Sequence, residues 1–281
     1  MKTALILQGG GMRGAYTSGV LDQLMIKEIE FDALYGVSAG AKNGQYFISK
    51  QIGEAYRVDV YSSRDEKAIS LHNLIKQGGI IDAEYYKNVI IKEIAPLNEN
   101  FASSPMKFFI GATNVETGEM HYFEKSSCDT LDAIIASCSI PLIQKIKYID
   151  GIGYLDGGIA EGIPLSDALK NYEKIVVVLT RPKGYREKED KAIQKACNLK
   201  YKKYPNLIKA FAKRVEVYNQ TMALIEKLDA EGKIIAIFPS EEITIRILEK
   251  NEEKIRALYD LGRSDTAKKI ETIKEFLKKE E

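Results

Sequence analysis

A pentapeptide centred on Ser38 has the composition of a nucleophile turn. Residues 36–40 read GVSAG, which satisfies the pattern G-x-S-x-G, and they lie between a predicted strand at 31–35 and a predicted helix at 41–50. The glycines permit the tight strand-to-helix turn that exposes a serine hydroxyl, and the following N–H, of Ala39, can then face an oxyanion. We therefore expect Ser38 to attack an ester carbonyl, with a helix-capping serine as the structural alternative.

A glycine-rich loop at residues 9–14 could supply further oxyanion donors. It reads GGGMRG and connects a predicted strand at 2–8 to a predicted helix at 15–27. Glycines leave several backbone N–H groups unobstructed at a helix N-terminus, an arrangement that suits an anion or an oxyanion. Because the carboxyl ends of adjacent parallel strands meet at one edge of a sheet, this loop and Ser38 should be neighbours.

The same loop also satisfies G-x-G-x-x-G, so a dinucleotide-binding enzyme is an alternative interpretation. Such a fold has an acidic residue at the carboxyl end of its second strand, where it binds the ribose. Here that strand ends at Tyr35 and Gly36, whereas Asp32 lies near the start of the strand. This arrangement disfavours a dinucleotide, and we predict no cofactor.

The base that activates Ser38 has to be found among few candidates. The chain has two histidines, His72 and His121, and neither comes late in the sequence as the histidine of an α/β-hydrolase triad does. His121 alternates with its neighbours in a strand-like run, which favours a packing or surface role. Asp156, in the DGG at 156–158, is the alternative base. A carboxylate with a pKa of ~3.9 suits this role only if a dry site raises its pKa and an oxyanion hole lowers the barrier.

Together these motifs resemble the patatin-like phospholipases, a family of lipid acyl hydrolases with a Ser-Asp dyad and a three-layer α/β/α fold. ASCSIP at 136–141 is similar to the family's A-S-x-x-x-P, so the resemblance covers about residues 1–180, and GIP at 162–164 in place of N-x-P is nearer to bacterial members. The resemblance implies that Ser38 is the nucleophile and Asp156 the base. It also implies that Gly9, Gly10, Gly11 and Arg13 form the oxyanion loop. Ala39, whose N–H follows the nucleophile, completes the oxyanion hole.

The implied activity is that of a phospholipase, lysophospholipase or esterase acting on lipid esters. A catalytically silent lipid-binding relative is a further alternative. For Arg13 we favour a role in bracing the loop over a direct electrostatic role.

The elements that position these motifs alternate between strands and helices. Further strands are predicted at 107–113, 120–124, 145–149 and 174–180, and helices at 83–95, 130–137 and 165–171. The run IVVVL at 175–179 is apolar on both faces, as in a parallel strand covered by helices on both sides. We expect an α/β fold, a three-layer α/β/α sandwich with a central mostly parallel sheet, over residues 1–181. Residues 182–281, which are charged and mostly helical apart from a strand-like segment at 234–238, should form a C-terminal extension packed on the same domain.

Composition narrows the setting of the protein. The chain has 281 residues, 45% hydrophobic and 29% charged, and a net charge of +1, so we expect a globular protein without nucleic acid as a partner. Its N-terminal apolar stretch is too short for a signal sequence, and no apolar run approaches the ~20 residues of a membrane helix. Three cysteines without a CxxC pair favour a cytoplasmic location and packing as small apolar residues. No metal-ligand spacing is present, so no metal is predicted.

Positive charge is concentrated in residues 181–214. This segment has twelve Lys and Arg against three Asp and Glu, and its aromatic residues, Tyr185, Tyr201, Tyr204 and Phe211, are interleaved with the basic ones. Such a segment suits peripheral contact with an anionic membrane. A solvated helical face is the structural alternative.

Overall fold

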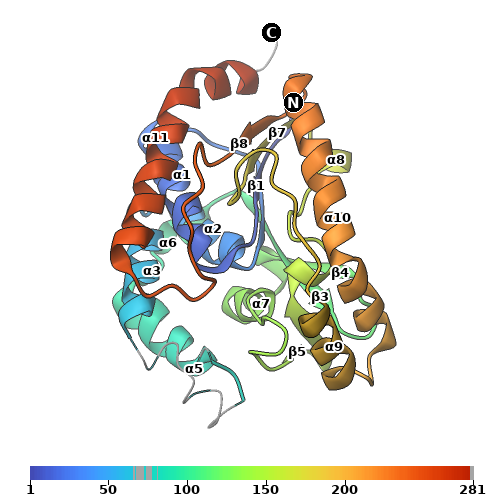
Figure 1. Ribbon diagram of the computed structural model, residues 1–281. Coiled ribbons are helices and arrows are strands. Elements are labelled where there is room, and N and C mark those ends of the chain that lie inside the picture. Colours follow the sequence, from blue (N-terminus) through green and yellow to red (C-terminus); the bar gives the residue numbers. More distant parts are fainter. Residues whose placement is uncertain (66, 68–72, 74–77, 81, 279–281) are drawn as a thin grey trace.

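The computed structural model describes residues 1–65, 67, 73, 78–80 and 82–278 (Figure 1). These residues form an eight-stranded sheet with the order β5-β6-β3-β2-β1-β7-β8, in which β4 also pairs with β3. Five strands run parallel to one another: β1 (Thr3–Leu7), β2 (Ala33–Val37), β3 (Lys107–Asn114), β7 (Lys174–Val178) and β8 (Ile235–Ile237). Three run antiparallel to their neighbours: β4 (Met120–Glu124), β5 (Lys147–Ile149) and β6 (Ile152–Asp156).

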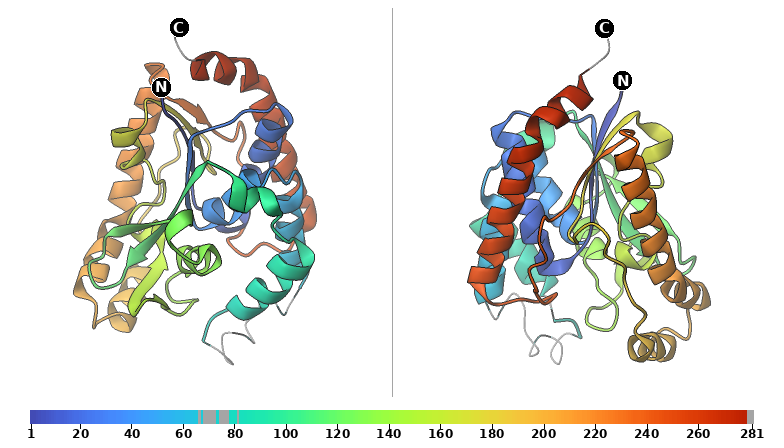
Figure 2. Two further views of the ribbon diagram at one scale, coloured as in Figure 1. Left: turned by 180° about the vertical axis from the view of Figure 1, so that it is seen from behind. Right: turned by 45° about the horizontal axis from the view of Figure 1, so that its top comes forward.

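Helices cover both faces of the sheet, as the right-hand view of Figure 2 shows. On one face, Leu5, Leu34 and Val176 pack in a cluster with residues of α1 (Gly14–Ile26), α2 (Ala39–Ile48) and α11 (Glu252–Leu277). On the other face, the alternate residues Ile6, Tyr35 and Val177 pack with residues of α8 (Ala168–Asn171) and α10 (Pro205–Ala230). This alternation is why the strands are apolar on both faces, and it confirms the expected three-layer α/β/α architecture.

Several shorter helices and turns lie between these elements along the chain. The α-helices are α3 (Glu54–Arg64), α5 (Ala83–Tyr85), α6 (Glu99–Ser103), α7 (Thr130–Ser137) and α9 (Lys191–Lys200). Three 3₁₀ turns are present, η1 (Gly11–Arg13), η3 (Lys125–Ser127) and η4 (Gly157–Ile159). The helix predicted at 83–95 is one turn of α-helix followed by a π-helix, η2 (Tyr86–Ile94). The sequence did not indicate α3, α6 or β6.

The C-terminal part of the chain is interlocked with the N-terminal part. Strand β8 lies at the edge of the sheet beside β7, and α11 crosses α1 in backbone contact. A methyl group added to Gly19 would lie 2.0 Å from the Tyr259 carbonyl oxygen, and one added to Gly262 would lie 2.1 Å from the Tyr16 carbonyl oxygen. Each helix therefore needs a glycine where the backbone of the other passes.

Candidate active site

Ser38 lies on a sharp turn between β2 and α2. Its backbone angles, φ 54° and ψ −122°, are unusual for a residue with a side chain. The flanking glycines are needed because the backbone is crowded: a methyl group added to Gly40 would lie 2.5 Å from the Leu7 carbonyl oxygen, and one added to Gly36 would lie 2.7 Å from the backbone of Ala41. The turn therefore has the strand-to-helix geometry that the sequence predicts.

The backbone of this turn is held by Ser137, at the end of α7. The Ser38 N–H donates to the Ser137 hydroxyl oxygen at 2.7 Å, and that hydroxyl donates to the Gly111 carbonyl at 2.6 Å. Both hydrogen bonds are buried, so they are not weakened by competing water. Ser137, the first serine of the ASCSIP stretch, therefore holds the backbone of the nucleophile turn, a role that the sequence alone did not reveal.

Asp156 is the last residue of β6 and pairs with Ala112 of β3. Its backbone is fixed on both sides, because its N–H donates to Ser139 and its carbonyl accepts from the Thr113 hydroxyl, each at 2.9 Å. Its side chain caps η4 by accepting from the Gly158 N–H at 2.7 Å. The carboxylate is therefore held in one orientation.

The side chains of Ser38 and Asp156 meet in a nearly dry site. They are 6% and 7% exposed, and the Ser38 side chain is close enough to the Asp156 carboxylate to influence the pKa of that carboxylate. Burial raises the pKa of Asp156 to about 6, although the interactions with Ser38 and Gly158 oppose this rise. A carboxylate with this pKa remains ionised at neutral pH and is a stronger base than an aspartate in water.

Cys138 is a neighbour of this pair that the sequence did not identify. Its thiol is close enough to Ser38 for the two side chains to interact, and burial raises the pKa of the thiol to about 12. The thiol therefore stays protonated and uncharged beside the serine. All three cysteines pack against hydrophobic clusters: Cys197 is buried, and Cys128 and Cys138 are partly buried.

The glycine loop lies against the nucleophile. A methyl group added to Gly9 would lie 3.2 Å from Ser38 Cβ. The Gly9 N–H donates to the Gly162 carbonyl at 3.1 Å, and the Met12 N–H donates to the Ile247 carbonyl at 3.0 Å. Within the described part of the chain, the backbone N–H groups with no protein acceptor at this edge are those of Gly10, Gly11 and Ala39.

Arg13 lies on the opposite side of the loop from the cavity. The groups that act on it electrostatically are Arg181, Tyr218, Tyr185 and Glu187, and burial is the main reason why its pKa is lowered. Its Nε is buried and has no hydrogen-bond partner in the described structure. The bracing hydrogen bonds expected from this side chain are therefore not seen, and its role in the loop stays a prediction.

A largely apolar cavity opens beside Ser38. It offers ≈ 110 Å³ to the centres of water-sized molecules. Its walls come from the glycine loop, α2, α3, α7 and the loop before α11, and the lining includes Met12, Ala39, Tyr86, Ile134, Ile135, Ile140, Ile247 and Leu248. A buried ion pair between Lys42 and Asp59 also reaches the cavity. Such a cavity suits the acyl chain of an ester whose carbonyl lies at Ser38.

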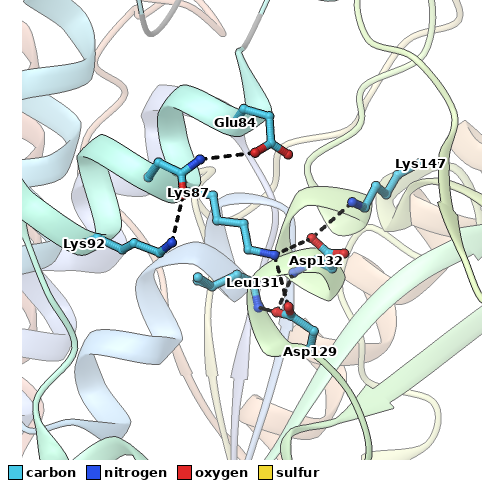
Figure 3. Close-up of polar contacts among 8 residues, drawn as sticks. Glu84, Lys87, Lys92, Asp129, Leu131, Asp132 and Lys147 are labelled. Atoms are coloured by element: carbon cyan, nitrogen blue, oxygen red, sulfur yellow. Dashed lines mark hydrogen bonds and ion pairs between the residues drawn. The ribbon is translucent and has the colours of Figure 1, made fainter.

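Polar contacts beside the cavity hold η2 against α7 (Figure 3). Lys87 donates to Asp129 and to Asp132, each at 3.0 Å, and Lys147 pairs with Asp132 at 3.0 Å. Asp129 also caps α7 by accepting from the Leu131 N–H at 3.0 Å. These contacts fix the wall that contains Ile134 and Ile135.

The other residues considered from the sequence lie away from the site or outside the structure. His121 of β4 pairs with Ala112 of β3. Strand β4 lies along one edge of β3, and β6, which carries Asp156, lies along the other. The His121 ring packs against Phe123 and Tyr154. His72 lies outside the described residues. Asp32 accepts from the N–H and the hydroxyl of Thr3, at 2.7 and 3.0 Å, at the start of β2. It is therefore at the wrong end of the strand to bind a ribose.

Comparison with known proteins agrees with this geometry. Residues 5–169, more than half of the chain, match the family model described as patatin-like phospholipase. The chain belongs to the patatin-like phospholipase family. Membership in this family supports a lipid-hydrolysing activity. Residues 204–278 match a second model, described as a domain of unknown function, DUF6363.

Three relatives show how far the similarity extends. The chain is 28% identical to the uncharacterized protein YjjU of Escherichia coli K12, over 93% of this chain and 75% of that protein. It is 24% identical to a cUMP-AMP-activated phospholipase of Escherichia coli, over 97% and 93% of the two chains. It is 26% identical to a probable lipid hydrolase, 463L, of Invertebrate iridescent virus 6, over 60% and 64%. The first two similarities include the C-terminal helices.

Proposed function

We propose that this protein is a serine acyl hydrolase of lipid esters, of the phospholipase, lysophospholipase or esterase type. The observation that carries the proposal is the position of the Ser38 side chain, on a strained turn, beside the buried carboxylate of Asp156. A strained turn that presents a serine to a base of raised pKa is the arrangement that an activated nucleophile needs.

In the proposed reaction, the Ser38 oxygen attacks the ester carbonyl while Asp156 accepts the hydroxyl proton. The tetrahedral oxyanion would receive hydrogen bonds from the free N–H groups of Gly10, Gly11 and Ala39. Asp156 then gives the proton to the departing alcohol, which leaves an acyl group on Ser38. A water molecule loses its proton to Asp156, attacks this acyl group and releases the fatty acid, and the proton returns to Ser38.

Gly9 and Arg13 have supporting roles in this proposal. The Gly9 N–H is occupied by the Gly162 carbonyl, so Gly9 would position the loop without binding the oxyanion. Arg13, whose neighbours are Tyr185, Tyr218 and Arg181, would fix the start of α1 from the other side.

Covalent labelling of Ser38 provides a direct test. A fluorophosphonate probe should label the wild-type protein, and hydrolysis of a short p-nitrophenyl ester should be measurable. Ser38→Ala should abolish both, whereas Ser49→Ala, which removes another buried serine hydroxyl after α2, should retain both. Full ester hydrolysis by Ser38→Ala would exclude the proposal.

A second test distinguishes the dyad from a triad with a histidine. His121→Ala and His72→Ala should each hydrolyse a soluble ester within a few-fold of the wild-type rate, because no step of the proposed reaction uses an imidazole. If either variant is folded but inactive, Asp156 is not the sole base.

We also propose that the protein acts in the cytoplasm and contacts anionic membranes through residues 181–214. Two aromatic residues of this segment, Tyr201 and Phe211, are buried in a cluster between α9 and α10, so they would not contribute to the contact. The exposed apolar side chains there are Ile193 and Leu199 of α9, and Leu199 is 76% exposed. No helix of the described residues is long and apolar enough to cross a bilayer, so the contact would be peripheral.

The charges and the position of α9 support this contact. The segment's arginines are paired, Arg181 with Glu242, Arg186 with Glu226 and Arg214 with Glu187, whereas Lys195, Lys202 and Lys203 have no ion pair in the described structure. Helix α9 also contacts the loop that lines the cavity: Lys200 donates to the Leu142 carbonyl at 3.2 Å, and the Leu142 N–H donates to the Tyr201 hydroxyl at 3.0 Å. A membrane bound to α9 would therefore lie near the cavity.

Vesicle binding tests this surface. The double variant Lys202→Glu, Lys203→Glu should bind vesicles of anionic lipid more weakly than wild type, since each lysine near such a surface contributes ~1 kcal/mol. Lys27→Glu, Lys227→Glu, an equal change of charge on exposed lysines elsewhere, should bind like wild type. If the wild type sediments equally with neutral and anionic vesicles, residues 181–214 do not bind anionic membranes and form only a solvated surface.

A further inference from the structure

The loop between β8 and α11, residues 238–251, runs along the glycine loop and reaches the cavity beside Ser38 (Figure 1). Ile247 is its point of contact. The Ile247 carbonyl accepts from the Met12 N–H at 3.0 Å, and a methyl group added to Gly11 would lie 2.9 Å from Ile247 Cγ2. The side chains of Ile247 and Leu248 both line the cavity.

Both ends of this loop are tied to α11, the helix that packs against α1. Near its start, the Ser240 N–H donates to Asp265 of α11 at 2.9 Å, and the same carboxylate accepts from the Tyr16 hydroxyl of α1 at 3.3 Å. At its end, Asn251 caps α11. The loop is therefore held over the turn from which α1 begins, and its position is not set by surface contacts alone.

Ile247 has an unusual environment for an apolar residue. It is 47% exposed, although it packs against the glycine loop on one side. It also lines a cavity whose other apolar residues, such as Ile134 and Ile135 of α7, belong to the catalytic region. An acyl chain in this cavity would cover the apolar surface that the free protein leaves open, and the hydrophobic effect favours such burial.

We propose that Ile247 determines which acyl-chain lengths the enzyme accepts, so that the C-terminal region supplies one wall of the acyl pocket. This inference rests on the proposed ester hydrolysis at Ser38. It assigns a task to the region matched by the domain of unknown function, 204–278. That region carries no catalytic group in the proposed reaction, and it would act by shaping the cavity.

Chain-length profiles test the inference. The kcat/KM should be measured for a series of soluble p-nitrophenyl esters with short and medium acyl chains. Ile247→Ala removes three carbons from the wall, so the ratio of kcat/KM for the longer to the shorter esters should rise by about 10-fold, because even one methylene in a pocket can change discrimination by this amount. Ile247→Phe, which narrows the cavity, should move the ratio in the opposite direction.

Ile26→Ala provides the matched control, because Ile26 ends α1 far from the glycine loop and is 42% exposed. It should keep the wild-type profile. If folded Ile247→Ala and Ile247→Phe variants keep the wild-type ratio, or change all esters equally, Ile247 does not select the acyl chain. Unfolding is assessed by circular dichroism, and folding failure of both variants would make Ile247 a structural residue and overturn the assignment. Absence of ester hydrolysis in the wild type would instead contradict the proposed function.

Discussion

Val37 and Asp156 are the terminal residues of two strands that meet end to end along the same edge of β3, where they pair with Gly111 and Ala112. Strand β2 approaches this point parallel to β3, and β6 approaches it antiparallel. The opposite edge of β3 is occupied by β4. The nucleophile that follows Val37 and the carboxylate of Asp156 are thus both positioned by adjacent residues of one strand, and their separation depends little on loops.

The rate of hydrolysis should depend on the ionisation of Asp156. The raised pKa of about 6 means that the carboxylate is protonated, and unable to act as a base, at lower pH. We expect kcat/KM for a soluble ester to fall about tenfold for each pH unit below about 6 and to level off above it. A profile with a midpoint near 4 would show that burial does not perturb the base in solution.

Asp156→Asn should abolish turnover and yet stabilise the protein at neutral pH. The pKa of Asp156 is raised on folding from the usual 3.8 to about 6, so the carboxyl group favours the folded state below its unfolded pKa, and this stability is lost as the pH rises through about 6. The shift corresponds to roughly 3 kcal/mol. The free energy of unfolding of the variant relative to wild type should therefore rise by up to this amount between pH 4 and pH 8.

Urea denaturation at the two pH values measures this difference. Asp260→Asn, at an exposed position on α11, should show no such pH-dependent gain. A variant that is destabilised equally at both pH values would indicate that the carboxylate is stabilising in its ionised form.

Ser137→Ala should impair catalysis without removing any reacting group. It leaves the Ser38 N–H and the Gly111 carbonyl without their buried partner, which costs about 1–3 kcal/mol of stability and lets the nucleophile turn relax. A displacement of about 1 Å can reduce rates by about 10²-fold. We expect kcat to fall while KM changes little. Ser127→Ala removes an exposed hydroxyl that also donates to a carbonyl, and it should leave kcat unchanged.

Gly11→Ala should reduce kcat by about 10²–10³-fold, as expected when an oxyanion donor is lost. Gly11 has φ +57°, and an added methyl group would lie 2.7 Å from the Ile247 carbonyl oxygen. Gly151→Ala is a control for backbone strain without the loss of an oxyanion donor. Gly151 also has positive φ, +78°, but it has open space around it. Both variants should lose stability through backbone strain, Gly11→Ala more so because its methyl group meets Ile247, and only Gly11→Ala should lose kcat. An increase confined to KM would identify the loop as a substrate-binding element.

Much of the fold could be predicted from the sequence because buried parallel strands are continuous apolar runs. The strands at 2–8, 107–113 and 174–180 were placed within two residues of β1, β3 and β7. Strand β6 was missed because its sequence, IGYLD, contains a glycine and directly precedes DGG. Its pairing with β3 depends on tertiary register, which local propensity does not contain.

The candidate site could be predicted only where a motif marks it. Ser38 and Asp156 lie in motifs, and the structure brings their side chains together. Lys42 and Ile247 lie in no motif, and Cys138 occupies a variable position of A-S-x-x-x-P, so only the structure shows that these residues reach the cavity. Within the segment 181–214, Tyr201 and Phe211 are buried, because helical periodicity turns them toward the core, and interleaving in the sequence does not reveal this orientation.

The reciprocal glycines of α1 and α11 have a consequence for the timing of biosynthesis. Helix α1 ends at residue 26, whereas the helix that packs against it ends at residue 277. At a synthesis rate of about 5–20 residues per second, a ribosome needs on the order of 10–50 s to make the intervening chain. During that interval Gly19 has no partner, and the loop that precedes α1 lacks its contact with Ile247. The nascent chain therefore cannot complete this site before α11 has been made.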